Sequence, residues 1–350
     1  MINRMIDYYE PKVLRGVIKK TLPLRTFFKS RFFANSVMFP TERVYFEFQE
    51  NQRVLAPYVN PRIGSELVER DEYTVKSFEA PQVAPLRAIT NDTLAQKLLG
   101  EQPYNSGLTP EDRAAEIAAN DIRELQDTIW RREEYMCARL KQDGKLIIKG
   151  KGLNEVVDYG FTNIKPLAAN ERWSDDFDII GQLGEVCQEL ARSGVAAGMV
   201  ILGVDAASAL FRNKKFMRLM DSRRIDIGEI KPSQLENGVS YIGRLMVPGA
   251  ALELVMYSEW YKDETGKLAP LVDPETVIIQ GLNEQNSMLY GANTFISKSG
   301  EWETHMEQYT PRTWFTENPS QKFISIISRP LPMPHDVKSW YVLKGVVTGA

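Results

Sequence analysis

Helical periodicity is the strongest feature in the pattern of apolar and polar positions. Between residues 109 and 143 the apolar positions Ala118, Ile122, Leu125, Ile129, Met136 and Leu140 recur at spacings of three, four or seven. Thr109 is suited to cap a helix, Pro110 fits its first position, and no other glycine or proline follows before Gly144. The pattern predicts a single helix, about 50 Å long at roughly 1.5 Å per residue.

Charged residues occupy the remaining faces of this helix. They are Glu111, Asp112, Arg113, Arg123, Glu124, Arg131, Arg132, Glu133, Glu134 and Arg139. Charged faces of this kind are expected for a helix that contacts different neighbours along its length. They are equally expected for a long surface helix of an ordinary domain.

Residues 1–40 form a basic segment. Lys12, Arg15, Lys19 and Lys20 lie in a short amphipathic helix pattern that ends at Pro23. These side chains can face a polyanion such as packaged DNA or a scaffold, although a solvated face on a docking helix explains them more simply. An aromatic cluster follows, which we expect to dock on the body or on a neighbouring subunit: Leu24, Phe27, Phe28, Phe32, Phe33 and Phe39.

Strand periodicity replaces helical periodicity between residues 40 and 90. Val44, Phe46 and Phe48 alternate with polar neighbours, and a second strand pair is expected at residues 66–70 and 74–78. The segment has too few apolar residues for a core of its own. It therefore predicts an extended two-stranded arm that needs another surface, such as a second copy of the protein.

The remainder predicts a compact α+β body. A hairpin is expected at 145–149 and 156–161, a helix capped by Ser174 that runs to about Ser193, and a buried strand at 199–204. Asp205 is expected to cap a helix through Phe211, with an extension to Met220 left open. Further strands are expected at 240–247, 252–257, 276–280, 323–328 and 340–347, with a polar hairpin tip at 259–270.

Composition is that of an ordinary soluble protein of 350 residues with a formal net charge of −3, which argues against a general nucleic-acid-coating protein. No apolar run approaches a membrane span, and the first residues do not resemble a secretion signal, so we expect a cytoplasmic protein without a membrane partner. Cys137 and Cys187 lack paired spacing and are expected to be reduced and structural.

Catalytic motifs are not found in the sequence. Gly150-Lys151-Gly152 lacks the third glycine of a phosphate loop, and His305 and His335 have no second ligand at metal spacing. Asp175, Asp176 and Asp178 are explained by the start of a helix. We predict no catalytic, cofactor-binding or metal site, and therefore no enzyme.

The order of these parts resembles the major capsid proteins of tailed bacteriophages, which have the Hong Kong 97-type fold, and specifically the lambda-type capsid protein E family. The stretches that carry the resemblance are Leu24-Arg25-Thr26-Phe27-Phe28, Pro40-Thr41-Glu42-Arg43-Val44-Tyr45, Tyr58-Val59-Asn60-Pro61, Gly64-Ser65-Glu66-Leu67-Val68, Ala209-Leu210-Phe211-Arg212, Ser222-Arg223-Arg224, Val239-Ser240-Tyr241-Ile242-Gly243 and Val255-Met256-Tyr257-Ser258. Their order and spacing, rather than any one of them, make the resemblance specific.

This resemblance implies a division into named parts: an N-terminal arm at 1–40, an extended loop at 41–90, a peripheral domain at 91–173 with its spine helix at 109–143, a mainly axial domain at 174–320, and C-terminal strands at 321–350 that return to the peripheral domain. It implies self-assembly into hexamers and pentamers of an icosahedral head around double-stranded DNA, in the host cytoplasm and then in the virion. Expected partners are the protein itself, a portal, a scaffold and a decoration protein.

Assembly contacts are expected at the loop and the spine helix. The residues are Arg43, Val44, Phe46, Glu47, Phe48, Arg62, Glu66, Glu69, Arg70, Arg131 and Arg132. Charges at such contacts can select the register between neighbours. Two alternatives remain: an encapsulin-like compartment with the same fold, and an α/β enzyme with a site in the loops of residues 259–315.

Overall fold

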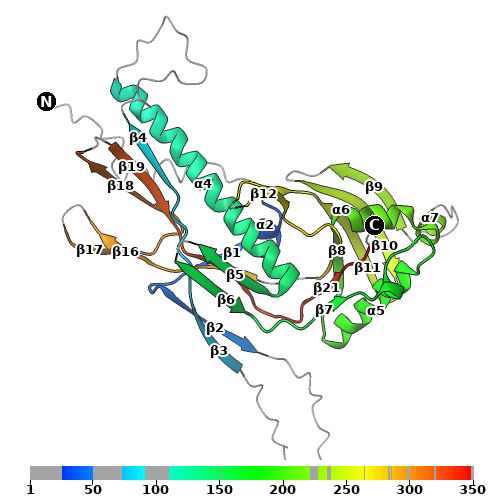
Figure 1. Ribbon diagram of the computed structural model, residues 1–350. Helices are drawn as coiled ribbons and strands as arrows, with labels where there is room; N and C mark the ends of the chain where they lie inside the picture. Colours follow the sequence, from blue (N-terminus) through cyan, green and yellow to red (C-terminus); the bar gives the residue numbers. More distant parts are fainter. Residues whose placement is uncertain are drawn as a thin grey trace, which may run out of the picture.

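The long helix α4 (Pro110–Asp143) crosses the computed structural model diagonally (Figure 1). The structure describes residues 26–49, 73–90, 110–150, 152–220, 228–234, 238–263, 265–282, 284, 286–297, 300–318 and 321–347. The predicted helix is confirmed, and the chain turns at Gly144, whose φ is +63°. A Cβ atom at this position would lie 2.3 Å from Cβ of Phe161, so the turn requires glycine.

A seven-stranded mixed sheet forms the body at the right of Figure 1. Its strands, in spatial order, are β7 (Ile164–Pro166), β21 (Trp340–Lys344), β14 (Val277–Gly281), β8 (Ala197–Leu202), β11 (Ala250–Tyr257), β10 (Val239–Val247) and β9 (Gly228–Gln234). The central strand β8 is buried along its whole length, as its apolar run predicted.

The two faces of this sheet border different cores. Met199 and Ile201 of β8 belong to a core shared with the C-terminal half of α4, whereas Val200 and Leu202 pack with α5 (Ile179–Arg192) and α6 (Val204–Arg212). This alternation follows from the two-residue period of a strand. The sheet is therefore a wall between two apolar layers.

A third core lies beneath the N-terminal half of α4. Ile122, Leu125 and Ile129 pack there on Ile324 and Ile326. The supporting sheet contains β18 (Thr310–Thr316), β19 (Gln321–Ile327) and β4 (Leu86–Thr90). One helix thus spans two separate cores.

A second three-stranded sheet contains β1 (Asn35–Met38), β15 (Asn286–Tyr290) and β20 (Pro330–Pro334). β20 is an edge strand with prolines at positions 330, 332 and 334. Proline has no N–H group, so the hydrogen-bond ladder to β15 can use only the N–H groups of Leu331 and Met333. The backbone groups of the prolines therefore point away from β15. The Tyr159 hydroxyl donates to the carbonyl of Pro332 at 2.7 Å, which agrees with this orientation.

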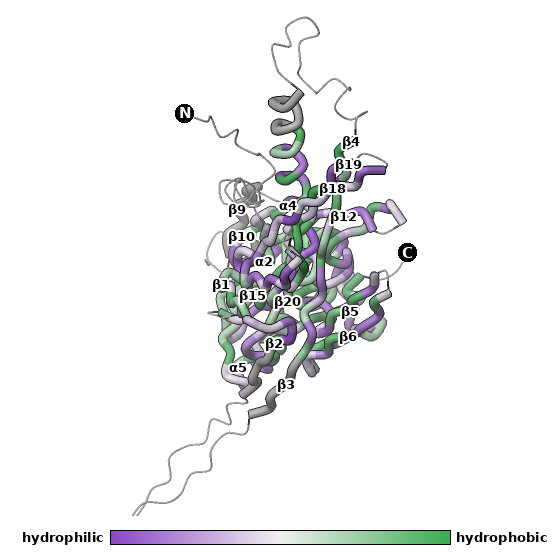
Figure 2. Tube along the Cα trace, turned by 90° about the vertical axis from the view of Figure 1, so that its left-hand side faces the viewer, coloured by the Kyte–Doolittle hydropathy of each residue, from purple (hydrophilic) through white to green (hydrophobic). Residues whose placement is uncertain are grey.

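Four hairpins complete the described strands. They are β2 (Arg43–Gln49) with β3 (Tyr73–Glu79), β5 (Lys145–Gly150) with β6 (Leu153–Asp158), β12 (Trp260–Lys262) with β13 (Leu268–Pro270), and β16 (Asn293–Ile296) with β17 (Trp302–His305). The β2–β3 hairpin leaves the body at the end opposite the start of α4 (Figure 2). β3 covers the expected strand 74–78, but its antiparallel partner in the structure is β2. The expected partner strand 66–70 lies outside the described residues, so that pair stays a prediction.

Two predicted helix limits are wrong. The helix expected from Ser174 begins at Ile179, because the Asp178 carboxylate caps it by accepting from the N–H of Gly181 at 3.1 Å. Asp205 lies in the first turn of α6, whose cap position is Gly203. The open extension to Met220 is a separate helix, α7 (Lys214–Met220).

The break between α6 and α7 has a local cause at Asn213. Its side-chain oxygen accepts from the N–H of Phe216 at 2.8 Å, and its amide donates to the carbonyls of Ser174 and Phe177. A short helix, η1 (Ala169–Glu171), precedes α5.

The described members of the aromatic cluster dock on the body of their own chain, and Leu24 lies outside the described residues. Phe28 and Phe32 lie in the short helix α2 (Phe28–Phe32) and, with Phe27 and Phe33, are buried in the main core. Phe27 stacks on Tyr257 with ring centroids 5.6 Å apart. Of the two alternatives for this cluster, the structure shows the intramolecular one.

The C-terminal strands divide between sheets. β19 lies beneath α4, β20 pairs with β15, and β21 joins the seven-stranded sheet between β7 and β14. The division into arm, loop, peripheral and axial parts stays a prediction, and β21 belongs to the large sheet rather than to the sheet beneath the helix.

Ile129 provides a test of the third core. Its side chain is fully buried, so Ile129→Ala should lower the free energy of unfolding of the unassembled subunit by about 2–5 kcal/mol. Thr128→Ala, at an exposed neighbouring position of α4, should change it by less than about 0.5 kcal/mol. Urea denaturation followed by circular dichroism measures both, and equal losses would show that this part of α4 is not anchored.

Candidate assembly site

A glutamate of α4 holds the start of α2. Oε1 of Glu134 accepts hydrogen bonds from the N–H groups of Phe27 at 2.9 Å and Phe28 at 2.8 Å. Oε2 accepts from the N–H of Lys29 at 2.9 Å, and the Tyr257 hydroxyl donates to Oε1 at 3.1 Å. Phe27, the cap residue of α2, gives no side-chain cap, so a residue of α4 satisfies the N–H groups that a helix start leaves unpaired.

Burial sets the acidity of this carboxyl group. Glu134 is 3% exposed, and desolvation raises its pKa above the usual value of 4.5. The three backbone hydrogen bonds and the Tyr257 hydroxyl act in the opposite direction, because they stabilise the charged form, but burial prevails.

The adjacent Glu133 organises a second polar cluster. It pairs with the Lys29 ammonium, and its carboxylate accepts from the hydroxyls of Tyr290 and Tyr309 at 3.0 Å each. The Trp130 indole N–H donates to the Tyr309 hydroxyl at 2.9 Å. Burial, followed by the charge of Glu133, raises the pKa of Tyr309 to about 12. Burial alone would lower the pKa of Lys29, but the charges and hydrogen bonds of Glu133 and Tyr309 raise it overall.

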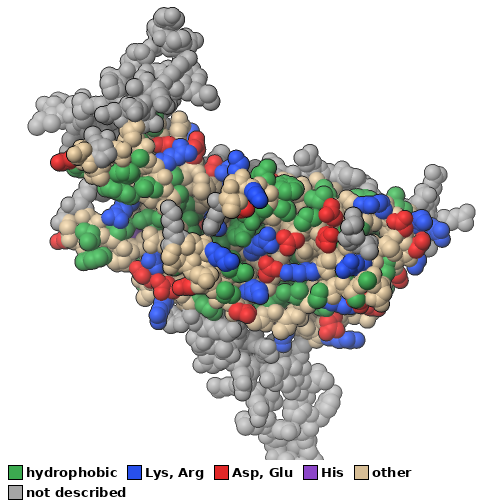
Figure 3. All heavy atoms as spheres, in the orientation of Figure 1, with side chains coloured by type: hydrophobic (Ala, Val, Ile, Leu, Met, Phe, Trp, Pro, Cys, Tyr) green, Lys and Arg blue, Asp and Glu red, His purple; other side chains and the backbone are tan. Residues whose placement is uncertain are grey.

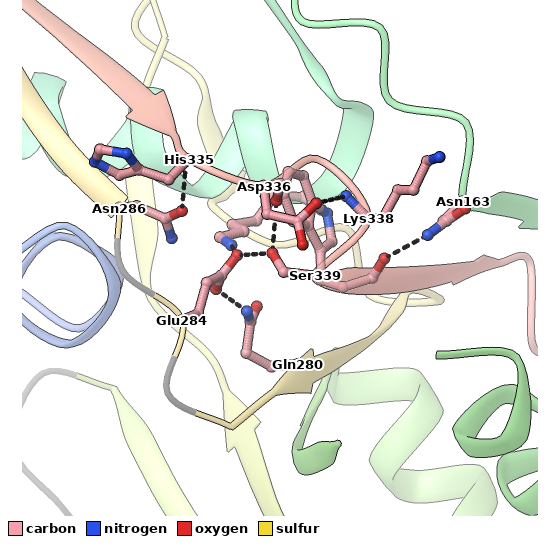
Figure 4. A network of polar contacts seen from close by, with 10 residues as sticks. Asn163, Gln280, Glu284, Asn286, His335, Asp336, Lys338 and Ser339 are labelled. Atoms are coloured by element: carbon pink, nitrogen blue, oxygen red, sulfur yellow. Dashed lines mark hydrogen bonds and ion pairs between the residues drawn. The ribbon is translucent and has the colours of Figure 1, made fainter. Parts of the chain in front are cut away.

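A third cluster ties the end of α4 to the body, and Figure 4 shows three of its members, Gln280, Glu284 and Ser339. The buried ammonium of Lys141 pairs with Glu284, whose carboxylate also accepts from Ser339 and Gln280. The Lys141 nitrogen lies 4.0 Å from the ring centroid of Trp340. Burial lowers the pKa of Lys141, although the charge of Glu284 opposes the shift. These contacts join α4 to β14 and to the segment before β21.

These clusters correct one prediction about the long helix. Glu133 and Glu134 were expected among charged faces that contact neighbours, but both are buried in their own chain. Their partners lie about a hundred residues or more away in the sequence, with separations of 104 for Lys29–Glu133 and 123 for Tyr257–Glu134. Nothing in the local pattern separates them from solvated glutamates.

Other positions of α4 keep exposed charges. Arg123, Glu124, Arg131 and Arg132 are exposed, and Arg87 of β4 pairs with Glu124 and with Asp121. The Arg132 guanidinium lies 5.7 Å from the ring centroid of Tyr135. Arg131 and Arg132 are therefore accessible, and their part in assembly stays a prediction.

The loop residues predicted for assembly are only partly described. Arg43 is exposed at the start of β2. Val44 is fully buried in the main core of its own chain, so it has no side-chain surface to offer a neighbour, and its assignment to an interface is wrong. For Phe46, Glu47 and Phe48 the structure gives the strand and its register, opposite Lys76, Val75 and Thr74. Outside the described residues lie Lys12, Arg15, Lys19, Lys20, Arg62, Glu66, Glu69 and Arg70.

Exposed apolar side chains mark surfaces that the sequence analysis missed. They occur on three of the hairpins: Ile147, Leu153 and Val156 on β5–β6, Trp260 and Leu268 on β12–β13, and Ile296 and Trp302 on β16–β17. Figure 3 shows apolar side chains in separate patches over the molecule, including the end that carries β18 and β19. The sequence signal that could have indicated these surfaces is the presence of apolar residues at the outward positions of short strands, where polar residues are expected.

Both histidines and both cysteines have structural surroundings. His305 stacks on Phe295 with centroids 5.0 Å apart, and His335 shares a hydrogen bond of 2.9 Å with the Ser287 hydroxyl. Cys137 and Cys187 are free and buried, as predicted. Within the described residues no group of three metal-ligating side chains comes together. No helix in the same part of the chain is long and apolar enough to cross a membrane.

Comparison with protein families gives one match that spans nearly the whole chain. The family described as phage major capsid protein E matches residues 10–344. The chain is also similar to the major capsid protein of Escherichia phage lambda, at 25% identity over 314 residues that cover 87% of this chain and 89% of the relative. The major capsid protein of Escherichia phage N15 is 24% identical over 97% of this chain and 99% of its own.

Solved structures show the same fold. A protein described as a prophage capsid protein of Escherichia coli CFT073 superposes with a TM-score of 0.70 at 18% identity, over 96% of this chain and 98% of its own. The expected α+β, Hong Kong 97-type fold is therefore confirmed.

Glu134 gives the stability a definite pH dependence. Because its pKa is raised on folding, the folded state binds the proton more tightly than the unfolded chain does, so this carboxyl favours folding at low pH. That contribution is fully present below the usual pKa of 4.5 and is lost as the pH rises through the folded value. We expect the unfolding free energy of the wild type, relative to non-titrating Glu134→Gln, to fall as the pH rises.

Urea titrations of the unassembled subunit at several pH values measure this difference. The exposed Glu124, replaced in the same way as Glu124→Gln, is the control and should give a nearly flat difference. A wild-type advantage over Glu134→Gln that grows with pH would contradict the assignment.

Proposed function

Since the chain belongs to the phage major capsid protein E family, we propose that it forms hexamers and pentamers of an icosahedral phage head that encloses double-stranded DNA. Its family function is to build a multimeric capsid, so its place is the virion. Assembly in the host cytoplasm, with a portal, a scaffold and a decoration protein as partners, is part of the proposal.

The extent of the family match is the observation that carries this proposal. It begins at residue 10 and ends at residue 344, so it includes the projecting hairpin, α4 and the seven-stranded sheet together. An encapsulin-like compartment would use the same fold, but the family and the named relatives favour the phage head. We assign no catalytic role, because the family is one of structural proteins.

The fold explains how such a subunit can assemble. A two-stranded hairpin is marginal alone, and here Val44, Phe78 and Ala80 fix its base in the core. The rest of β2 and β3 leads away from the body (Figure 1). A rigid base with an extended arm suits a contact with an adjacent subunit, and many modest contacts repeated around closed rings give a stable shell.

Contacts with DNA are proposed for the basic N-terminal segment. Non-specific binding to phosphates requires cations rather than a shaped pocket. Lys12, Arg15, Lys19 and Lys20 supply such charges in a chain whose net charge is −3. The same residues would serve a scaffold contact during assembly.

Shortening the arm tests its role in assembly. Gln49 and Tyr73 are cross-strand partners, so replacing residues 50–72 by Asn-Gly joins β2 to β3 through a favourable two-residue turn and keeps Val44 in place. We expect a folded, soluble subunit that forms no shells. Circular dichroism, sedimentation and negative-stain microscopy measure this, and normal particles would refute the arm contact.

Charge reversal on α4 tests its exposed face. Arg131→Glu with Arg132→Glu should leave the helix content and melting temperature almost unchanged, because both side chains are exposed, but should reduce the yield of shells at least tenfold. Arg131→Lys with Arg132→Lys, which keeps both charges, should assemble. Full assembly of the charge-reversed variant would show that this face of α4 is not part of an assembly interface.

A further inference from the structure

The β16–β17 hairpin presents an apolar pair to solvent. Ile296 and Trp302 are directly opposed across the two strands, and they are 47% and 73% exposed. Thr294 and Thr304 form the next pair on the same face, with their hydroxyls 3.1 Å apart. An exposed tryptophan at this position costs solubility unless another surface covers it.

The other face of this hairpin is clamped to its own chain. Phe295 stacks on His305, and the Arg312 guanidinium lies 5.1 Å from the ring of Phe295 and 5.3 Å from the ring of Trp314. The Asn293 amide donates to the Thr310 hydroxyl at 3.1 Å. The clamp fixes the orientation of the hairpin on β18, so the Ile296–Trp302 pair is held outward.

A second hairpin has a matching outward face. In β5–β6, Ile147 and Val156 are directly opposed and are 49% and 55% exposed. The inward neighbours Leu146 and Val157 are each 2% exposed and anchor the hairpin in the main core. This surface, too, is apolar, rigidly held and uncovered within the subunit.

The charges beside the two pairs are complementary. Lys145 and Lys149 are exposed on the same face as Ile147, two residues to either side of it. The exposed Asp158 lies opposite Lys145, whereas the neutral Asn154 lies opposite Lys149, so Lys149 supplies the positive charge at this margin. Glu301 is exposed and directly precedes Trp302. The two hairpins lie apart in Figure 1, β16–β17 at the left edge and β5–β6 near the centre, so they do not cover one another in one subunit.

We propose that the Ile296–Trp302 pair of one subunit docks on the Ile147–Val156 pair of a second copy, with Glu301 beside Lys149. This contact rests on the proposed shell-forming function and names one of its interfaces. The two surfaces differ, so the contact is heterologous and can pass from subunit to subunit around a ring or across a shell. Both components are apolar strand pairs of similar width, with opposite charge at their margins.

Cysteine pairing tests the contact directly. The native cysteines Cys137 and Cys187 are buried. A disulfide formed between subunits can therefore be assigned to the exposed cysteines introduced as Glu301→Cys and Lys149→Cys. The two variants are mixed, assembled, purified as shells and oxidised mildly. We expect a disulfide-linked dimer on a non-reducing gel in the mixture and none when either variant is assembled alone.

The controls separate this contact from the proposed function. Glu301→Cys mixed with Arg192→Cys, at an exposed position of α5, should give no dimer. Shells from the Glu301→Cys and Lys149→Cys mixture that contain no dimer, or no more than this control, would overturn the contact while leaving the capsid function intact. Failure of the unmodified protein to form any shells would overturn the function and the contact together.

Substitutions give a second measurement. Trp302→Ala should raise the protein concentration needed for assembly about tenfold without changing the circular dichroism spectrum, and Trp302→Phe should recover most of the loss. Glu301→Lys and Lys149→Glu should each weaken assembly, and the double variant should restore it. Assembly of Trp302→Ala at the wild-type concentration would overturn the proposal.

Discussion

The burial of two adjacent glutamates on α4 is the constraint on which the rest of the structure depends. Glu134 satisfies three backbone N–H groups at the start of α2, and the adjacent Glu133 neutralises the ammonium of Lys29, whose N–H is one of those three groups. Without these acceptors the amides would be buried and unpaired, at a cost of about 1–3 kcal/mol each. The aromatic residues of α2 reach the main core only because this polar contact allows the chain to enter there.

The same helix joins regions that would otherwise be independent. Its N-terminal half covers β19 and β4, and its C-terminal half is fixed by Lys141 to Glu284 and by Gln142 to the backbone of Leu271 and Asp273. Apolar packing holds both halves, and buried polar pairs add to it at the C-terminal end. The helix therefore links the sheet beneath it to the seven-stranded sheet through direct contacts.

The long helix and the buried strand β8 could be predicted because their signals are local: a cap, a period and a terminating glycine in one case, and an uninterrupted apolar run in the other. The fold family came from the order and spacing of many short stretches. The buried roles of Glu133, Glu134 and Lys141 could not be predicted, since their partners are distant in sequence and a charged residue on a helix normally faces water. β20 was missed for another reason, because three prolines in five residues argue against a strand until its edge position is known.

Those three prolines have a consequence for a protein that accumulates at high local concentration. A free strand edge normally offers alternating N–H and carbonyl groups, on which a strand from another molecule can add. On the outer side of β20 the N–H donors are missing, the carbonyl of Pro332 already accepts from the Tyr159 hydroxyl, and all five residues of the strand are buried in the subunit. This edge therefore offers no site on which a strand of another molecule can add.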